Sequence, residues 1–174
     1  VSKIFDTTAF GYREIRVERP LKLAFQVTRE GLEALRDAKP FQRLDEAEQR
    51  VVMEALLVHL PKDEQWIDRE DFDKALTRAL KAAGVKVGAP VRKAILSALS
   101  ERDDDAEVCT DAKGKPEPDI DLRDHELVPL DEDWRDYVRR EVLPFVPDAW
   151  VDETHTDAQD GGVGRVGYEI NFNR

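Results

Sequence analysis

The stretch from residue 119 to residue 153 reads DIDLRDHELVPLDEDWRDYVRREVLPFVPDAWVDE, and the fold prediction depends on it more than on any other segment. It carries three prolines, two tryptophans and several Arg–acid pairs, with little apolar periodicity. A solvated linker offers nothing for a tryptophan to pack against, so Trp150 beside Pro147 and Asp148 argues against a linker. We expect this segment to be an ordered arm that docks onto the rest of the protein.

Four residues of this arm are the candidate site residues: Arg123, Asp124, Arg140 and Trp150. The interpretation that we favour is that Arg123 and Asp124 form ion pairs that hold the arm in place. In the alternative, an arginine of the arm reaches a DNA phosphate or a partner subunit, since a guanidinium group binds phosphate in bidentate geometry. Trp150 is expected to anchor the arm together with Trp134.

Residues 10–27, FGYREIRVERPLKLAFQV, predict a β-hairpin that precedes the helices. The second half of this run alternates apolar with other residues at a period of two, which is typical of a strand with one buried face. Pro20 cannot donate to a β-ladder, so it is placed between the two strands.

Residues 28–100 are predicted to form a small helical bundle, with apolar stripes at helical spacing. Asp45 and Glu48 have the spacing of a capping box at the start of one helix. Asp68 is expected to cap the next helix, and Pro90 stands where a first-turn proline begins another. We interpret these apolar stripes as the surfaces of a structural core that binds no ligand.

The remaining segments are a loop and arm over 101–130, a helix over 131–143, and an arm with a final strand over 144–174. Asp131 is the expected N-cap of that helix. The fold class is therefore predicted to be α+β and mostly helical. Because the sequence begins with Val1 rather than Met and ends soon after a strand-like run, we expect residues 1–174 to be a single C-terminal module of a longer chain.

Composition restricts the possible functions of the chain. Its formal net charge is −11 with a pI near 4.8, which argues against a free-standing DNA-binding module because phosphate contacts need clustered Lys and Arg. A local basic patch, or an acidic module inside a larger DNA-acting enzyme, remains open. No apolar stretch has the length of a membrane helix and no signal peptide is present, so a cytoplasmic location without a membrane partner is predicted. Cys109 is expected to be a reduced thiol.

No set of residues in the sequence has the spacing that a metal-binding, phosphate-binding or catalytic motif requires. The acidic run that begins at Asp103 lacks the Gly and Glu positions of a calcium loop. One cysteine and three separated histidines do not form a zinc site. The glycines of residues 161–164 follow no strand and open no helix, so they do not form a phosphate loop. No catalytic, cofactor-binding or metal-ligating residue is assigned.

Five stretches, however, resemble segments of a known family in their amino-acid sequence and in their order along the chain. They are FGYREIRVERPLKLAFQV (10–27), KAILSALSERDDDAEVC (93–109), GKPEPDIDLRDHELVPL (114–130), REVLPFVPDAWVDE (140–153) and VGYEINF (166–172). Together they resemble the C-terminal part of the modification subunit of type I restriction-modification systems, an N6-adenine DNA methyltransferase family. The sequence departs from that pattern at His125 and Asn171, and in the acidic, glycine-rich break over 155–165.

The resemblance implies a parent protein that uses S-adenosylmethionine, bound at a Gly-rich turn, and holds a flipped adenine with an Asn-Pro-Pro-aromatic motif. This chain has no Asn-Pro pair, and its only asparagines are Asn171 and Asn173. We therefore expect it to be inactive alone, with no cofactor of its own. The implied partners are the catalytic domain of the same chain, the specificity and restriction subunits, and DNA through the assembled complex.

Two alternatives remain open at this point. The first is an acidic helical protein-interaction adaptor that is unrelated to methylation. The second is an enzyme that uses a pair of carboxylates in the arm as acid and base, which would need a cleft with strongly perturbed acids.

Overall fold

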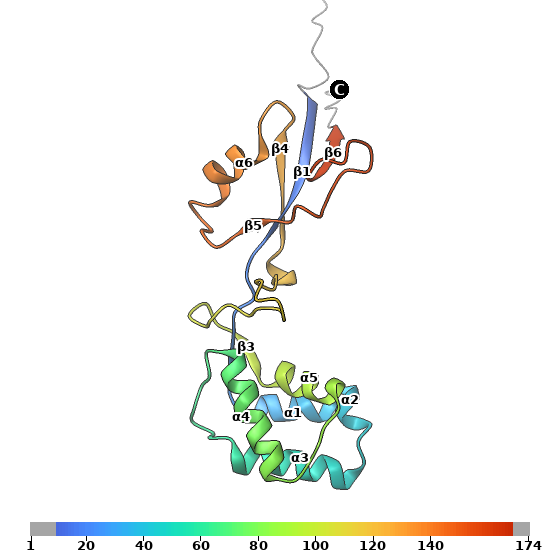
Figure 1. Ribbon diagram of the computed structural model, residues 1–174, viewed down its shortest axis with the longest axis vertical. Helices are drawn as coiled ribbons and strands as arrows, with labels where there is room; N and C mark the ends of the chain where they lie inside the picture. The colour runs from blue at the N-terminus through green and yellow to red at the C-terminus, as the bar shows by residue number, and fades with distance from the viewer. Residues whose placement is uncertain (1–9, 169–174) are drawn as a thin grey trace, which may run out of the picture. The chain divides into compact units, whose positions relative to one another are not determined.

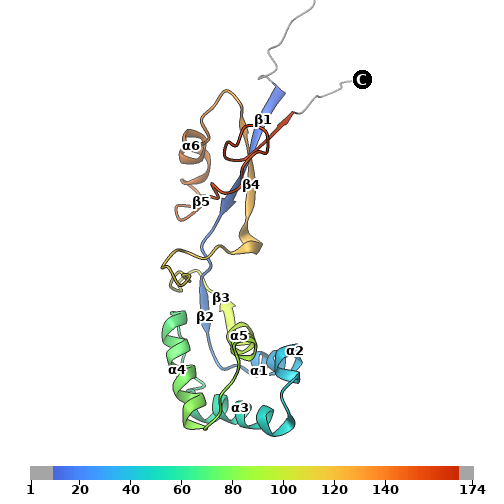
Figure 2. The same cartoon turned by 45° about the vertical axis from the view of Figure 1, so that its right-hand side comes forward.

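The computed structural model describes residues 10–168, and their contacts divide them into two compact units (Figures 1 and 2). The first, the sheet unit, combines residues 10–20 with residues 117–168. The second, the helical unit, is the continuous segment Leu21–Pro116.

The sheet unit is built around β1 (Gly11–Glu18), which has a partner along each of its edges. β4 (Asp124–Pro129) pairs antiparallel with one edge of β1. β5 (Trp150–Val151) and β6 (Arg165–Tyr168) pair antiparallel with successive parts of the other edge. β1 is therefore the central strand of this sheet, although it comes first in the chain.

Side-chain alternation along β1 creates the core of the sheet unit, because Ile15 and Val17 point to the same face. The short helix α6 (Trp134–Tyr137) and the following π-helical turn η3 (Val138–Val142) pack against that face. A 3-10 turn, η2 (Ile120–Leu122), precedes β4. The buried members of this core are Ile15, Val17, Val128, Val138 and Val142.

The helical unit surrounds a second core. Its helices are α1 (Arg29–Asp37), α2 (Lys39–Gln42), α3 (Glu46–His59), α4 (Arg69–Ala82) and α5 (Ala89–Ala98), and its two strands are β2 (Leu23–Phe25) and β3 (Ser100–Arg102), which pair antiparallel. The rings of Phe25 and Phe72 stack with their centroids 4.7 Å apart. Trp66 meets Phe72 edge-on at 5.2 Å, so three aromatic rings form the centre of this core.

Two predicted helix starts are confirmed by hydrogen bonds. The Asp45 carboxylate accepts from the Glu48 N–H at 2.8 Å, and the Glu48 carboxylate accepts from the Asp45 N–H at 3.2 Å, which completes the capping box of α3. Asp68 caps α4 by accepting from the Glu70 N–H. Both caps satisfy backbone donors that the first turn of a helix leaves without a partner.

The predicted β-hairpin over residues 10–27 is wrong. β1 and β2 do not pair with each other, because β1 pairs with β4, β5 and β6 while β2 pairs with β3. The break at Pro20 is where the chain leaves the sheet unit. A period of two identifies a strand but not its partner, so the sequence pattern does not specify which strands pair.

Two further boundaries need correction. Residues 101–130 were expected to be a loop and arm, yet they contain part of β3, η2 and the whole of β4. Asp131 does not cap a helix; Asp133 does, through the Arg135 N–H at 2.7 Å, because a turn intervenes after β4. The final strand is observed from Arg165 to Tyr168, and the rest of that prediction lies outside the described residues.

The α+β class itself is confirmed, with helices outweighing strands. Within residues 10–168, no helix combines the length and the apolar character that crossing a membrane requires. That the chain is one module of a longer protein stays a prediction.

Gly31 in α1 allows α1 and α5 to approach closely. A Cβ at this position would lie 2.6 Å from the carbonyl oxygen of Ala98. Gly31→Ala is therefore expected to lower the free energy of unfolding by about 1–3 kcal/mol, because overpacking outweighs the roughly 1 kcal/mol gain in helix propensity. Thermal denaturation measures the change.

Gly88→Ala is the matched control, since the nearest atom to its added Cβ is 3.6 Å away. It should cost less than about 1 kcal/mol, as expected for a changed N-cap. Equal losses in the two variants would contradict a steric role for Gly31.

Candidate functional site

Arg123 is held in an ion pair within the sheet unit. Its Nε and Nη2 atoms lie 2.8 and 2.7 Å from Oε1 of Glu18, the last residue of β1. The Glu18 side chain is only 4% exposed, whereas that of Arg123 is 28% exposed. The hydrogen bond to Glu18 raises the pKa of Arg123. The second carboxylate oxygen of Glu18 is buried and has no hydrogen-bond partner among residues 10–168.

Trp150 belongs to the same cluster, because it stands opposite Glu18 in the pairing of β1 with β5. Two of the four predicted site residues, Arg123 and Trp150, are thus brought together around Glu18. Sequence reasoning missed Glu18, since it is 105 residues from Arg123 and no local pattern connects the two.

Asp124 lies next to Arg123 in sequence but on the other face of the sheet. It stands opposite Val17, and alternation along a strand puts Val17 and Glu18 on opposite faces. Its carboxylate accepts from the N–H of His125 at 2.8 Å. Asp124 is therefore no part of the cluster around Glu18.

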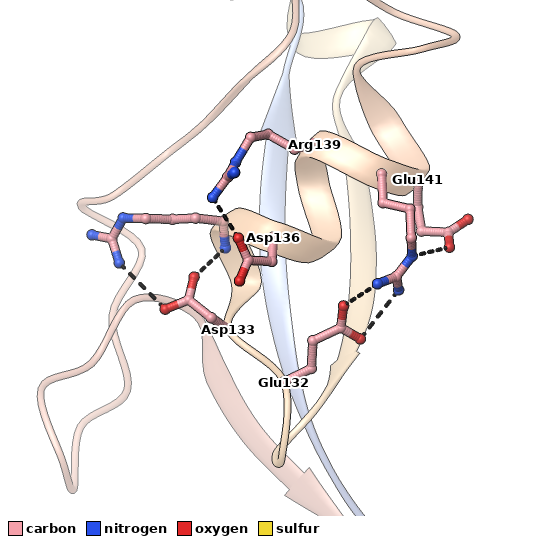
Figure 3. Close-up of polar contacts among 7 residues, drawn as sticks. Glu132, Asp133, Asp136, Arg139 and Glu141 are labelled. Atoms are coloured by element: carbon pink, nitrogen blue, oxygen red, sulfur yellow. Dashed lines mark hydrogen bonds and ion pairs between the residues drawn. The ribbon is translucent and has the colours of Figure 1, made fainter.

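Arg140 lies in a separate network of charges along α6 and η3 (Figure 3). Its guanidinium contacts both carboxylate oxygens of Glu132, at 2.6 and 3.2 Å, and Glu141 at 2.7 Å. These hydrogen bonds, that with Glu132 first, raise the pKa of Arg140. Because two carboxylates surround one guanidinium, this position does not present a free positive charge.

The neighbouring cations are paired in the same way. Arg139 contacts Asp136, and Arg135 lies 3.9 Å from Asp133 and over the ring of Trp134. Exposed pairs of this kind contribute little stability, typically below about 1 kcal/mol. Their effect is to make this face of α6 and η3 close to neutral.

Glu141 and Val142 of η3 also line a groove of about 320 Å³ within the sheet unit. Its lining combines apolar side chains with three carboxylates and one cation: Val17, Arg19, Leu122, Asp124, Glu126, Glu141, Val142, Phe145 and Val146. Phe145 is 81% exposed, which is unusual for a large aromatic side chain. Glu126 also accepts from the Tyr137 hydroxyl at 3.0 Å, and burial together with this bond raises the pKa of Tyr137.

The acidic, glycine-rich segment before β6 is fixed by hydrogen bonds. Arg13 reaches Asp160 at 2.6 Å, and Asp157 accepts from the N–H groups of Gln159 and Val166. These interactions lower the pKa of both Asp157 and Asp160. The segment is therefore an ordered part of the sheet unit.

His155 is buried in this segment, and its Nε2 atom has no hydrogen-bond partner among the residues that the structure describes. Burial, followed by the charge of Arg16, lowers its pKa from the ordinary value of 6.5. The unfolded chain then binds more protons than the folded chain between the two pKa values. The contribution to stability is complete above pH 6.5 and is lost as the pH falls toward the folded value.

His155→Gln is expected to weaken the fall in melting temperature between about pH 7.5 and about pH 5. Differential scanning calorimetry at the two pH values measures this. His59→Gln, at an exposed position of α3, is the control and should keep the native pH dependence. A variant at position 155 with an unchanged pH dependence would contradict the assignment.

No group of three or more His, Cys, Asp or Glu side chains among residues 10–168 is arranged to hold a metal ion. The Asp103 carboxylate accepts from the Asp105 N–H at 2.9 Å, which is the geometry of an ordinary turn. Cys109 is buried.

Comparisons of the chain with protein-family models, with curated proteins and with solved structures find no match.

Proposed function

We propose that this chain is a non-catalytic C-terminal module of a type I restriction-modification DNA methyltransferase subunit. In this role it supports the catalytic domain and assembly with the specificity subunit and DNA. Methyl transfer from S-adenosylmethionine to adenine N6 belongs to the parent protein, outside these 174 residues.

The observation that carries the proposal is that four of the five resembling stretches each contribute a strand to the sheet unit, while the fifth, 93–109, lies in the helical unit. The stretch over 10–27 contains β1, that over 114–130 contains β4, and that over 140–153 contains β5. The stretch that starts at Val166 overlaps β6. All four strands belong to a single sheet, so similarities that are scattered in the sequence are adjacent in space.

The cluster around Glu18 supports a scaffold role for the same unit. Arg123 and Trp150 both lie in resembling stretches, and both contact or pair with Glu18 at the end of the central strand. An arm fixed in this way presents one rigid surface to a neighbouring domain. A role of this kind requires order and no reactive group.

A protein-interaction adaptor unrelated to methylation is the second candidate. The groove beside Phe145 favours it, because an exposed aromatic side chain next to a groove of mixed apolar and charged lining is typical of protein contacts. An adaptor does not require the resembling stretches to share one sheet, and for this reason we place it second.

The sequence encoded before Val1 discriminates between the two candidates. The proposal expects a Gly-rich cofactor turn after a strand, followed by an Asn-Pro-Pro-aromatic motif. Their absence from the parent gene would contradict the proposal and favour the adaptor.

A reconstitution experiment then tests the role. The parent subunit with and without residues 1–174 is mixed with its specificity subunit, and co-purification and adenine methylation are measured. Loss of assembly on truncation is the expected result. The isolated chain should bind no S-adenosylmethionine in calorimetry, and micromolar binding would contradict a non-catalytic role.

A further inference from the structure

One segment of this acidic protein carries positive charge alone. The chain has 27 Lys and Arg against 38 Asp and Glu, yet residues 74–100 contain no acidic residue. Soluble proteins usually intersperse both signs over their surface. The cations of this segment are Lys74, Arg78, Lys81, Lys86, Arg92 and Lys93.

The helical unit places these cations on α4, on α5 and on the loop between them. Lys74, Arg78 and Lys81 are spaced by four and three residues, so they follow one face of α4. Beyond them lies a groove of about 480 Å³ between the end of α4 and the start of α5. Its lining contains no carboxylate and comprises Thr77, Leu80, Lys81, Gly84, Val85, Lys86, Val87 and Arg92.

Two of the six cations are already used within the unit. Arg92 bonds Asp73 through Nε at 2.9 Å and the Thr77 hydroxyl through Nη2 at 2.5 Å. Lys74 lies 3.0 Å from Asp71. The Arg92 contacts tie α5 to α4, whereas the Lys74 pair lies within α4, and both leave little positive charge for a ligand.

The other four cations have no ion-pair partner within the described part of the chain, and all four are exposed: Arg78, Lys81, Lys86 and Lys93. We call these four residues the basic face. The contrast with the arm is direct, because Arg123 and Arg140 are both held by carboxylates. A phosphate would have to displace a carboxylate from either arginine, but it meets no competitor on the basic face.

We propose that the basic face binds the phosphodiester backbone of duplex DNA without reading its sequence. Lysines and an arginine without ion-pair partners on two successive helices and the loop between them are the electrostatic footprint of phosphate binding. From Arg78 to Lys81 the axis of α4 rises by about 4.5 Å, which is close to the roughly 3.4 Å between successive phosphates of one DNA strand. The choice of DNA as the polyanion rests on the proposed function.

Fluorescence anisotropy of a labelled 20-base-pair duplex of arbitrary sequence tests this with the complete chain (roughly two helical turns of DNA). For the native protein we expect a dissociation constant on the order of 10⁻⁵ M at low salt. The plot of log K against log salt should have a slope of about −2 to −3, for about three phosphate contacts.

The double variant Lys81→Glu with Lys86→Glu should lose at least about tenfold in affinity and show a flatter salt slope. The control, Lys39→Glu with Lys62→Glu, changes the net charge equally at exposed positions outside the basic face. The dissociation constant of this control should lie within about twofold of the native value, after the general effect of its more negative net charge is subtracted. Circular dichroism confirms that both variants fold.

Equal losses in the two double variants would overturn the proposal, because the effect would then come from net charge alone. Failure of the native chain to bind the duplex at low salt would overturn it as well. The gene sequence before Val1 tests the proposed function independently of this binding experiment. DNA binding without the upstream motifs would refute the methyltransferase assignment and leave the basic face in place.

Discussion

Replacing Phe72 with alanine is expected to lower the free energy of unfolding of the helical unit by about 3–5 kcal/mol. Phe72 is completely buried, and its ring contacts both Phe25 and Trp66. Truncation removes the transfer free energy of the ring, leaves a cavity and breaks both ring contacts. Urea denaturation followed by Trp66 fluorescence measures the loss, provided that Trp134 and Trp150 are replaced by phenylalanine in all the proteins compared.

Phe145→Ala is the control for this prediction. It removes the same side chain from a position that is 81% exposed, so the change should stay within about 0.5 kcal/mol. Comparable losses at the two positions would show that Phe72 is not at the centre of the core.

Arg123→Met is expected to lower the melting temperature of the sheet unit by about 5 °C or more. Methionine keeps much of the apolar stem of Arg123 but leaves the Glu18 carboxylate buried without its cation. Glu18→Gln should cost less, because it removes the buried charge along with the ion pair. The double variant should therefore be more stable than Arg123→Met alone, and thermal denaturation of the three proteins gives the order.

The control is Arg139→Met, which removes an exposed cation from a surface pair with Asp136 and should hardly change the melting temperature. If Arg123→Met melted like the native protein but lost binding to DNA or to a partner subunit, the ion pair would not be its role. The alternative interpretation of Arg123 as a contact residue would then be favoured.

Sequence patterns predicted those elements whose determinants lie within one or two helical turns. The Asp45–Glu48 box and the Asp68 cap depend on neighbours three residues away or closer, and both are observed. Two strands are also predicted within residues 10–27, where β1 and β2 are observed, and the alternation that indicates a strand falls on β2. The pairing of β1, in contrast, is not local. Its three partners lie more than 100 residues downstream, and nothing in a period of two specifies which strands they are.

The same limit applies to the candidate site. Arg123 and Trp150 are predicted as site residues because their charged, proline-rich segment is expected to dock onto the rest of the protein. In the structure, both lie next to Glu18. Glu18 itself ends an unremarkable strand, so only the folded register reveals it. Asp124 is predicted as a pair with Arg123, but Asp124 begins β4 opposite Val17, and Val17 and Glu18 face opposite ways along β1, so the pair separates.

The bridge between Pro20 and Pro118, together with the hydrogen bond from the Asp119 N–H to the Arg19 carbonyl at 2.8 Å, closes the sheet unit where the intervening 21–116 segment departs and returns. In architectural terms that segment is a guest domain spliced into a host, with its entry and exit side by side. Evolution can lengthen, exchange or delete such a guest without breaking the host, since a short turn suffices to rejoin the two ends. Deleting residues 21–116 and linking Pro20 to Glu117 should yield the sheet unit alone, with β1 still paired with β4.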